Sequence, residues 1–111
     1  ILFNINKINL MKMDIEGYEI SALKGGLDTL KRVENLLIEF SPHLWKDPLD
    51  EAIEFFKILT DSGLQPHTLE NKCLKRFDKD DKDELFKRLI KIDRNDSSIS
   101  FFQRDFIFSR T

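Results

Sequence analysis

Residues 10–19 read LMKMDIEGYE, a short apolar run that ends in two acids and a glycine. The run over 8–15 is apolar on both faces apart from Lys12, which is typical of a strand covered by helices on both sides. Lys12 is either a snorkelling side chain at a sheet margin or an ion-pair partner of a nearby acid. Gly17 allows a tight turn into a following helix. We therefore predict a buried strand that ends near Asp14.

The segment after this strand predicts a helix with a break in its middle. Its apolar residues follow helical spacing and form one stripe. Gly25 and Gly26 interrupt the stripe, and each glycine costs about 1 kcal/mol relative to alanine in a helix interior. We predict one helix over about 18–24 and a shorter one that ends near 32. The apolar positions are Ile20, Leu23, Leu27 and Leu30.

The next elements continue the alternation of strand and helix. Residues 34–42, ENLLIEFSP, predict a second buried strand, and Pro42 ends it because proline has no N–H for the ladder. Asp47 and Pro48 predict the start of a long helix, which Gly63 caps at its C-terminal end. The expected apolar face of that helix consists of Leu49, Ile53, Phe56 and Leu59.

The last part of the chain is more charged. Residues 64–70 predict a weak strand, the stretch 71–98 predicts one helix, and 106–108 predict a terminal strand. The alternation indicates an α/β fold with a mostly parallel sheet and right-handed crossovers. Alternatively, the last two strands pair antiparallel as a hairpin at the sheet edge. The expected apolar positions of the helix in 71–98 are Leu85, Phe86, Leu89 and Ile90.

Composition excludes several classes of protein. The chain has 111 residues, which suits one domain with one core. Its net charge of −2 argues against a nucleic-acid binder driven by bulk electrostatics, and no apolar run approaches the roughly 20 residues of a membrane span. The single cysteine, Cys73, excludes an internal disulfide framework, so we expect a cytoplasmic protein. A calcium loop that starts at Asp78 would need glycine where Asp83 stands, and no metal site is expected.

Candidate functional residues follow the two predicted buried strands. Ligands of open α/β sheets bind beyond the carboxyl ends of the strands, where Asp14, Glu16 and Glu39 stand. Asp14 directly ends an apolar run, whereas Glu16 also suits the N-terminus of the next helix. Glu39 is an acid inside an apolar strand and therefore needs a partner or a function. Ser41 and His43 follow it, and a solvent-exposed histidine without a function is the ordinary alternative for His43.

Three sequence blocks resemble the FkbM family of S-adenosylmethionine-dependent methyltransferases. They are KMDIEGYE at 12–19, LKGG at 23–26, and the acid Glu39 near the end of the next strand. The resemblance spans roughly 8–42, and the charged stretch 71–98 has no counterpart in it. It implies a Rossmann-like class I methyltransferase fold that is entered at its fourth strand. The whole chain, 1–111, would then be the C-terminal half of the domain, with a charged insertion at 71–98.

The resemblance also implies an activity, which is methyl transfer to a hydroxyl of a small-molecule, sugar or lipid acceptor. Asp14 and Glu16 would be catalytic, and Glu39 and His43 would bind the acceptor. S-adenosylmethionine would be bound mainly by residues upstream of residue 1, so these 111 residues alone should be inactive. The alternative is a non-catalytic α/β interaction module that lacks the cofactor half. A divalent metal held by two of the carboxylates is a less favoured option.

Overall fold

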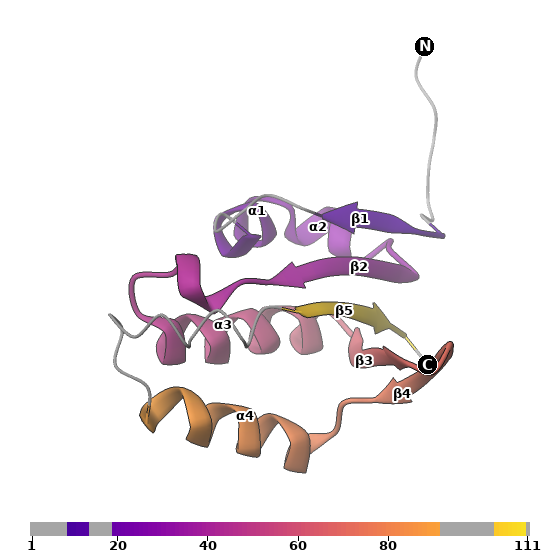
Figure 1. The fold of residues 1–111 in the computed structure, drawn as a ribbon. Coiled ribbons are helices and arrows are strands. Elements are labelled where there is room, and N and C mark those ends of the chain that lie inside the picture. Colours follow the sequence, from indigo (N-terminus) through magenta and orange to yellow (C-terminus); the bar gives the residue numbers. More distant parts are fainter. Residues whose placement is uncertain (1–8, 14–18, 92–103, 111) are drawn as a thin grey trace.

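The computed structural model describes residues 9–13, 19–91 and 104–110. The chain forms a two-layer α/β domain whose five strands lie in the order β1-β2-β5-β3-β4 (Figure 1). The strands are β1 (Met11–Met13), β2 (Asn35–Phe40), β3 (Gln65–Glu70), β4 (Cys73–Arg76) and β5 (Arg104–Ser109). The helices are α1 (Glu19–Gly25), α2 (Leu27–Leu30), the short 3-10 helix η1 (Pro42–Leu44), α3 (Pro48–Asp61) and α4 (Lys79–Lys91).

The sheet is mixed, and the prediction of a mostly parallel sheet is wrong. Among the described strands only β1 and β2 pair in parallel, whereas β2–β5, β5–β3 and β3–β4 are antiparallel. The reason is that β5 lies between β2 and β3 (Figure 1) and pairs antiparallel with both. The alternative of an antiparallel pair formed by β3 and β5 is confirmed, but that pair lies inside the sheet. The edge position belongs to β4 instead.

Strand β4 lies in the charged stretch 71–98, for which the sequence predicted only a helix. All four of its side chains are exposed, so its residues show no apolar alternation that would reveal a strand. The turn before it places Asn71 and Lys72 at φ angles of 50° and 66°. Two successive left-handed residues are typical of a tight β-hairpin turn. The hairpin formed by β3 and β4 therefore depends on local turn geometry rather than on burial.

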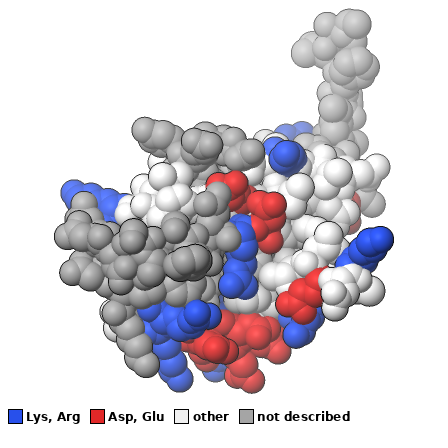
Figure 2. Space-filling model, in the orientation of Figure 1, with Lys and Arg blue, Asp and Glu red and all other residues white. Residues whose placement is uncertain are grey.

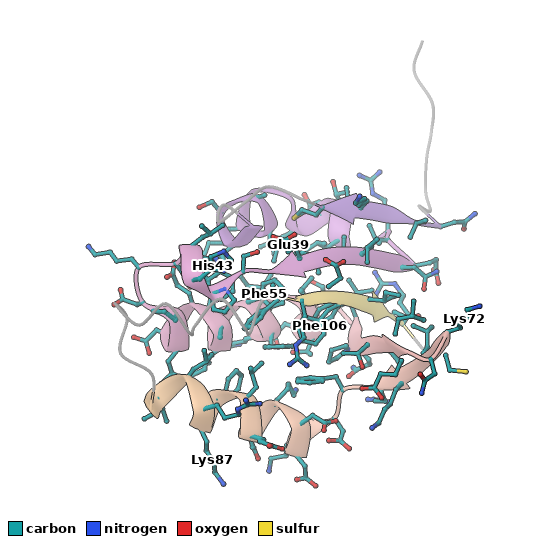
Figure 3. The ribbon with its side chains drawn as sticks, in the orientation of Figure 1. Glu39, His43, Phe55, Lys72, Lys87 and Phe106 are labelled. Atoms are coloured by element: carbon teal, nitrogen blue, oxygen red, sulfur yellow. The ribbon has the colours of Figure 1, made fainter. Side chains whose placement is uncertain are left out.

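The core lies between the helices and one face of the sheet. Leu36, Ile38 and Phe40 alternate with half-buried residues along β2 and are fully buried. They pair in register with Phe108, Phe106 and Arg104 of β5. Figure 3 shows Phe55 and Phe106 in this layer between the sheet and α3. Because the buried residues of all four α-helices belong to this one cluster, the helices cover a single face of the sheet.

The predicted break between α1 and α2 is confirmed, and it falls at Gly26. The predicted apolar faces are wrong at three positions, because Leu27, Ile53 and Ile90 are 45%, 44% and 65% exposed. The break at Gly26 interrupts the helical phase, so Leu27 no longer follows the stripe that precedes it. In helix α3, Phe55 faces the sheet and is fully buried, whereas Ile53, which the sequence predicted on the buried face, is not.

Arg110, just after β5, connects the ends of two helical segments. Its guanidinium donates hydrogen bonds to the carbonyl oxygens of Ser62 at 2.8 Å and Leu30 at 2.6 Å. Carbonyls at helix C-termini lack partners within the helix, so Arg110 satisfies two groups that would otherwise need water. Gly63 has a φ of 90°, and a Cβ at this position would lie 2.8 Å from the Nη1 of Arg110. The left-handed φ therefore favours glycine at this position, and a larger residue would also have to displace the guanidinium of Arg110.

We expect Arg110→Ala to lower the free energy of unfolding by about 1–3 kcal/mol, because partly buried carbonyl groups lose their donor. Arg110→Lys is the matched control, since it keeps the positive charge but cannot reach both carbonyls with a planar fork. Urea unfolding followed by circular dichroism measures both variants. Equal stability of Arg110→Ala and the wild-type protein would show that water replaces the guanidinium at no cost.

Candidate functional site

The parallel pair β1–β2 places the ends of the two predicted site strands side by side. Met13, the last described residue of β1, pairs in register with Ile38. The described end of β1 is therefore one register position from Glu39. Asp14 and Glu16 lie outside the described residues, so their assignments stay predictions.

Glu39 is held in place by the serine that follows it two residues later. The hydroxyl of Ser41 donates a hydrogen bond of 2.5 Å to Oε1 of Glu39. Ser41 is fully buried and Glu39 is half-buried, so this bond satisfies a hydroxyl that has no access to water. Hydrogen bonds to an ionised carboxylate are short and strong, and this one orients the carboxylate at the carboxyl end of β2. Sequence reasoning placed both residues at this edge without predicting the bond.

His43 lies on η1, beyond the end of β2, as Figure 3 shows. It is half-buried, and its Nδ1 has no hydrogen-bond partner within the described part of the chain. It lines neither the hollow beside Asp105 nor the smaller one between the β3–β4 hairpin and α4. Glu39 lines neither of them either, so the assignments of His43 and Glu39 to acceptor binding both stay predictions.

Asp105 is a candidate that sequence reasoning missed. It lies directly opposite Glu39 in the register between β2 and β5, so both carboxylates project from the face of the sheet that the helices leave uncovered. Like charges directly opposite one another destabilise a sheet, so this pair makes Asp105 a candidate beside Glu39. The signal was the charged pair Arg104-Asp105 immediately before an apolar strand. It could be interpreted only after β5 had been placed beside β2.

A hollow opens next to Asp105, where two strands of the sheet separate. β3 pairs with β5 as far as His67 and Ile107, and the same register would continue through Thr68 and Phe106 to Leu69 and Asp105. Leu69 and Asp105 instead line a hollow of about 600 Å³. That volume lies within the range of small-molecule sites in proteins. The residues that line it are Leu37, Thr68, Leu69, Glu70, Arg104, Asp105 and Ile107.

The hollow and the two acids combine an apolar surface with hydrogen-bond acceptors. Figure 2 shows this face, with acidic and basic side chains gathered beside an area of uncharged residues. A carboxylate can accept a hydrogen bond from a hydroxyl group and can take its proton when the geometry allows. Within the described ranges no three His, Cys, Asp or Glu side chains are grouped closely enough to hold a metal ion. The arrangement suits a ligand that presents a hydroxyl to the acids.

The described residues form an α/β domain with acidic side chains at the carboxyl end of β2 and on the neighbouring β5. Residues 2–89 match the family model of the methyltransferase FkbM domain, and the chain belongs to this family. Comparison with curated proteins and with solved structures gives no match. Among the described helices none is both long and apolar enough to cross a membrane.

Proposed function

We propose that the full-length protein transfers a methyl group from S-adenosylmethionine to a hydroxyl of a small-molecule, sugar or lipid acceptor. Membership of the methyltransferase FkbM family supports methyl transfer. The observation that carries the proposal is the carboxylate of Glu39, fixed by Ser41 at the edge where β1 and β2 end together. Such an edge is where open α/β sheets bind their ligands.

The described residues do not provide a complete site for S-adenosylmethionine. Within the described ranges no glycine directly follows the carboxyl end of a strand, whereas glycine-rich turns at such ends are the usual way that α/β folds approach a nucleotide. We therefore propose that the cofactor is held mainly by residues other than those that the structure describes. S-adenosylmethionine supplies an electrophilic methyl group when it is bound.

The acids of this chain would act on the acceptor. A hydroxyl oxygen becomes a better nucleophile as its proton moves to a neighbouring carboxylate, and Asp14 is the proposed proton acceptor with Glu16 beside it. Glu39, which Ser41 orients, would accept a hydrogen bond from the acceptor and so position it. Asp105 would add a second carboxylate on the same face.

Glu39→Gln tests this role, because glutamine keeps the size of the side chain but removes its charge. We expect kcat/KM for transfer of a radiolabelled methyl group to fall about tenfold in the full-length protein, which corresponds to about 1.4 kcal/mol of transition-state stabilisation. Glu54→Gln is the matched control. Glu54 forms an exposed ion pair with Lys24 at 2.6 Å, and such pairs contribute little to stability.

The outcomes distinguish a methyltransferase from a non-catalytic interaction module. Unchanged kcat/KM in Glu39→Gln would remove Glu39 from the acceptor site. Complete lack of methyl transfer by the wild-type full-length protein, across hydroxyl acceptors of all three classes, would favour the non-catalytic interaction module.

A further inference from the structure

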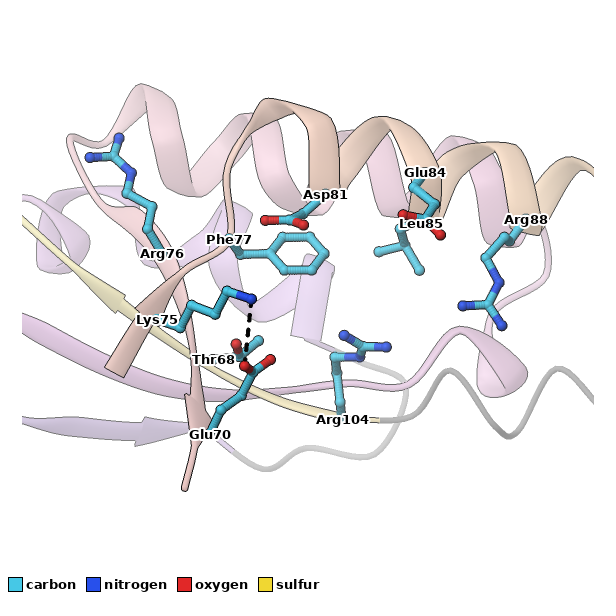
Figure 4. Close-up of a pocket in the computed structure, with 10 residues that line it drawn as sticks. All are labelled: Thr68, Glu70, Lys75, Arg76, Phe77, Asp81, Glu84, Leu85, Arg88 and Arg104. Carbon is cyan, nitrogen blue, oxygen red and sulfur yellow. Dashed lines mark ion pairs between the residues drawn. The ribbon is translucent and has the colours of Figure 1, made fainter. Parts of the chain in front are cut away.

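A second hollow meets the first at the place where β3 and β5 separate. It has a volume of about 150 Å³ and lies between the β3–β4 hairpin and α4 (Figure 4). Thr68, Glu70 and Arg104 line both hollows, so the two share one wall. The sheet does not close between these strands, since their pairing stops at His67 and Ile107. A ligand in the larger hollow can therefore contact Arg104, which also lines the smaller one.

Arg104 stands at the junction of the two hollows. Its guanidinium carbon lies 5.9 Å from the ring centroids of both Phe77 and Phe106, within the range of a cation–π contact. Arg104 is half-buried, and among the described residues no carboxylate lies within ion-pair distance of it. Figure 4 shows its side chain extending between Glu70 and Arg88. Partly buried cations usually have an anionic partner, so the geometry favours an anionic ligand here.

Other charged groups around the smaller hollow have partners within the protein. Lys75 lies 3.6 Å from Glu70, and the guanidinium of Arg76 donates a hydrogen bond to Gln65. The carboxylate of Asp81 accepts a hydrogen bond from the backbone N–H of Asp78 at 3.0 Å. These contacts leave Arg104 as the cation that a ligand would meet at the junction.

The larger hollow is lined by three large apolar side chains together with Thr68, Glu70, Arg104 and Asp105. Leu37 and Ile107 are cross-strand partners in the middle of the open face, and both are only half-buried. Leu69 is 61% exposed and extends the same apolar surface toward the edge of the sheet. Large apolar side chains exposed together in a hollow favour an apolar ligand group. The two hollows therefore differ in chemistry while they share one wall.

We propose that this split in the sheet binds an amphiphilic anion, with its carboxylate or phosphate on Arg104 and its apolar chain against Leu37, Leu69 and Ile107. Asp105 lines the same hollow and lies opposite Glu39, so a hydroxyl carried by the ligand would reach the acids of the proposed methylation site. The statement that this anion is the methyl acceptor rests on the proposed function. Binding of the anion at this site can be tested without S-adenosylmethionine.

Isothermal titration calorimetry of the full-length protein measures binding of three probes below their micellar concentrations. The probes are laurate, dodecyl phosphate and dodecyltrimethylammonium, which share a chain length and differ in head group. We expect at least one anionic probe to bind at least tenfold more tightly than the cationic one, and Arg104→Gln to weaken that binding about tenfold. The tighter anionic probe shows whether the head group is a carboxylate or a phosphate.

Lys87→Gln is the matched control, because it removes one positive charge from the outward side of α4, away from both hollows (Figure 3). Its Kd should equal that of the wild-type protein. Arg104→Lys keeps the charge, so it should weaken binding less than Arg104→Gln, and thermal unfolding of each variant verifies that it folds. A fourth probe, hexanoate, has the head group of laurate and a shorter chain. Leu69→Ser should reduce the ratio of the hexanoate Kd to the laurate Kd, because it shortens the apolar surface.

The proposal is overturned if no anionic probe binds, if the cationic probe binds as tightly, or if Arg104→Gln and Lys87→Gln have the same Kd. Because the titration needs no cofactor, each of these results leaves methyl transfer untouched. Conversely, normal binding in a protein that transfers no methyl group would contradict only the proposed enzymatic function.

Discussion

Phe40→Ala is expected to lower the free energy of unfolding by about 3–5 kcal/mol, since the substitution removes a large side chain and leaves a cavity. Phe40 is fully buried, and its ring centroid lies 5.2–5.8 Å from those of Trp45, Phe55, Phe56 and Phe106. Aromatic pairs at such distances add to the stability that burial alone provides. Small domains have a total stability of about 5–15 kcal/mol, so this single change removes a large part of it.

Urea unfolding measures the loss, and Leu44→Ala is its control. Leu44 lies four residues from Phe40 and is 48% exposed, so its replacement should change the free energy by less than about 0.5 kcal/mol. A similar loss in both variants would show that the aromatic cluster does not contribute more than an exposed leucine. Such a result would also weaken the link between the core and Glu39, because Phe40 lies between Glu39 and Ser41 in the chain.

Asp14→Asn is expected to abolish measurable methyl transfer in the full-length protein, a fall in kcat/KM of about 100-fold or more. An amide cannot accept the proton of the acceptor hydroxyl, and loss of a general base typically costs 100- to 10,000-fold. The substitution nearly preserves the shape of the side chain, so the midpoint of thermal unfolding should stay close to that of the wild-type protein. A radiolabelled methyl-transfer assay measures the change.

Asp28→Asn makes the same chemical change at a neutral position. The side chain of Asp28 is 99% exposed, and its contact with Lys31 is 3.9 Å long. Activity of this control should match that of the wild-type protein. If Asp14→Asn also turned over at the wild-type rate, Asp14 would have no part in the chemistry.

Local signals in the sequence predicted the elements that are defined by burial or by caps. The apolar run over 34–42 predicted β2, and Asp47-Pro48 predicted the start of α3. Gly26 interrupts the helix as expected. β4 was missed because its residues are all exposed and show no pattern. The position of β5 was also missed, because pairing between Phe106 and Ile38 connects distant residues and leaves no mark in either segment alone.

In the candidate site too, the sequence predicted the residue that a local pattern marks and missed those that depend on the strand order. Glu39 was predicted because a carboxyl group stood inside an apolar strand, which is a local anomaly. Asp105 and Arg104 became candidates only when β5 was placed next to β2. The hollow beside them results from the end of pairing between β3 and β5, and nothing in the sequence of either strand predicts where that pairing stops.

The central position of β5 has a consequence for how the protein is made. β2 and the β3–β4 hairpin leave the ribosome well before their common neighbour, because residues 41–103 separate β2 from β5 along the chain. Until β5 is synthesised, β2 and β3 each present an unpaired edge, and such edges promote aggregation. A nascent chain that stalls before Arg104 would therefore be a stronger substrate for chaperones than one that has passed Ser109.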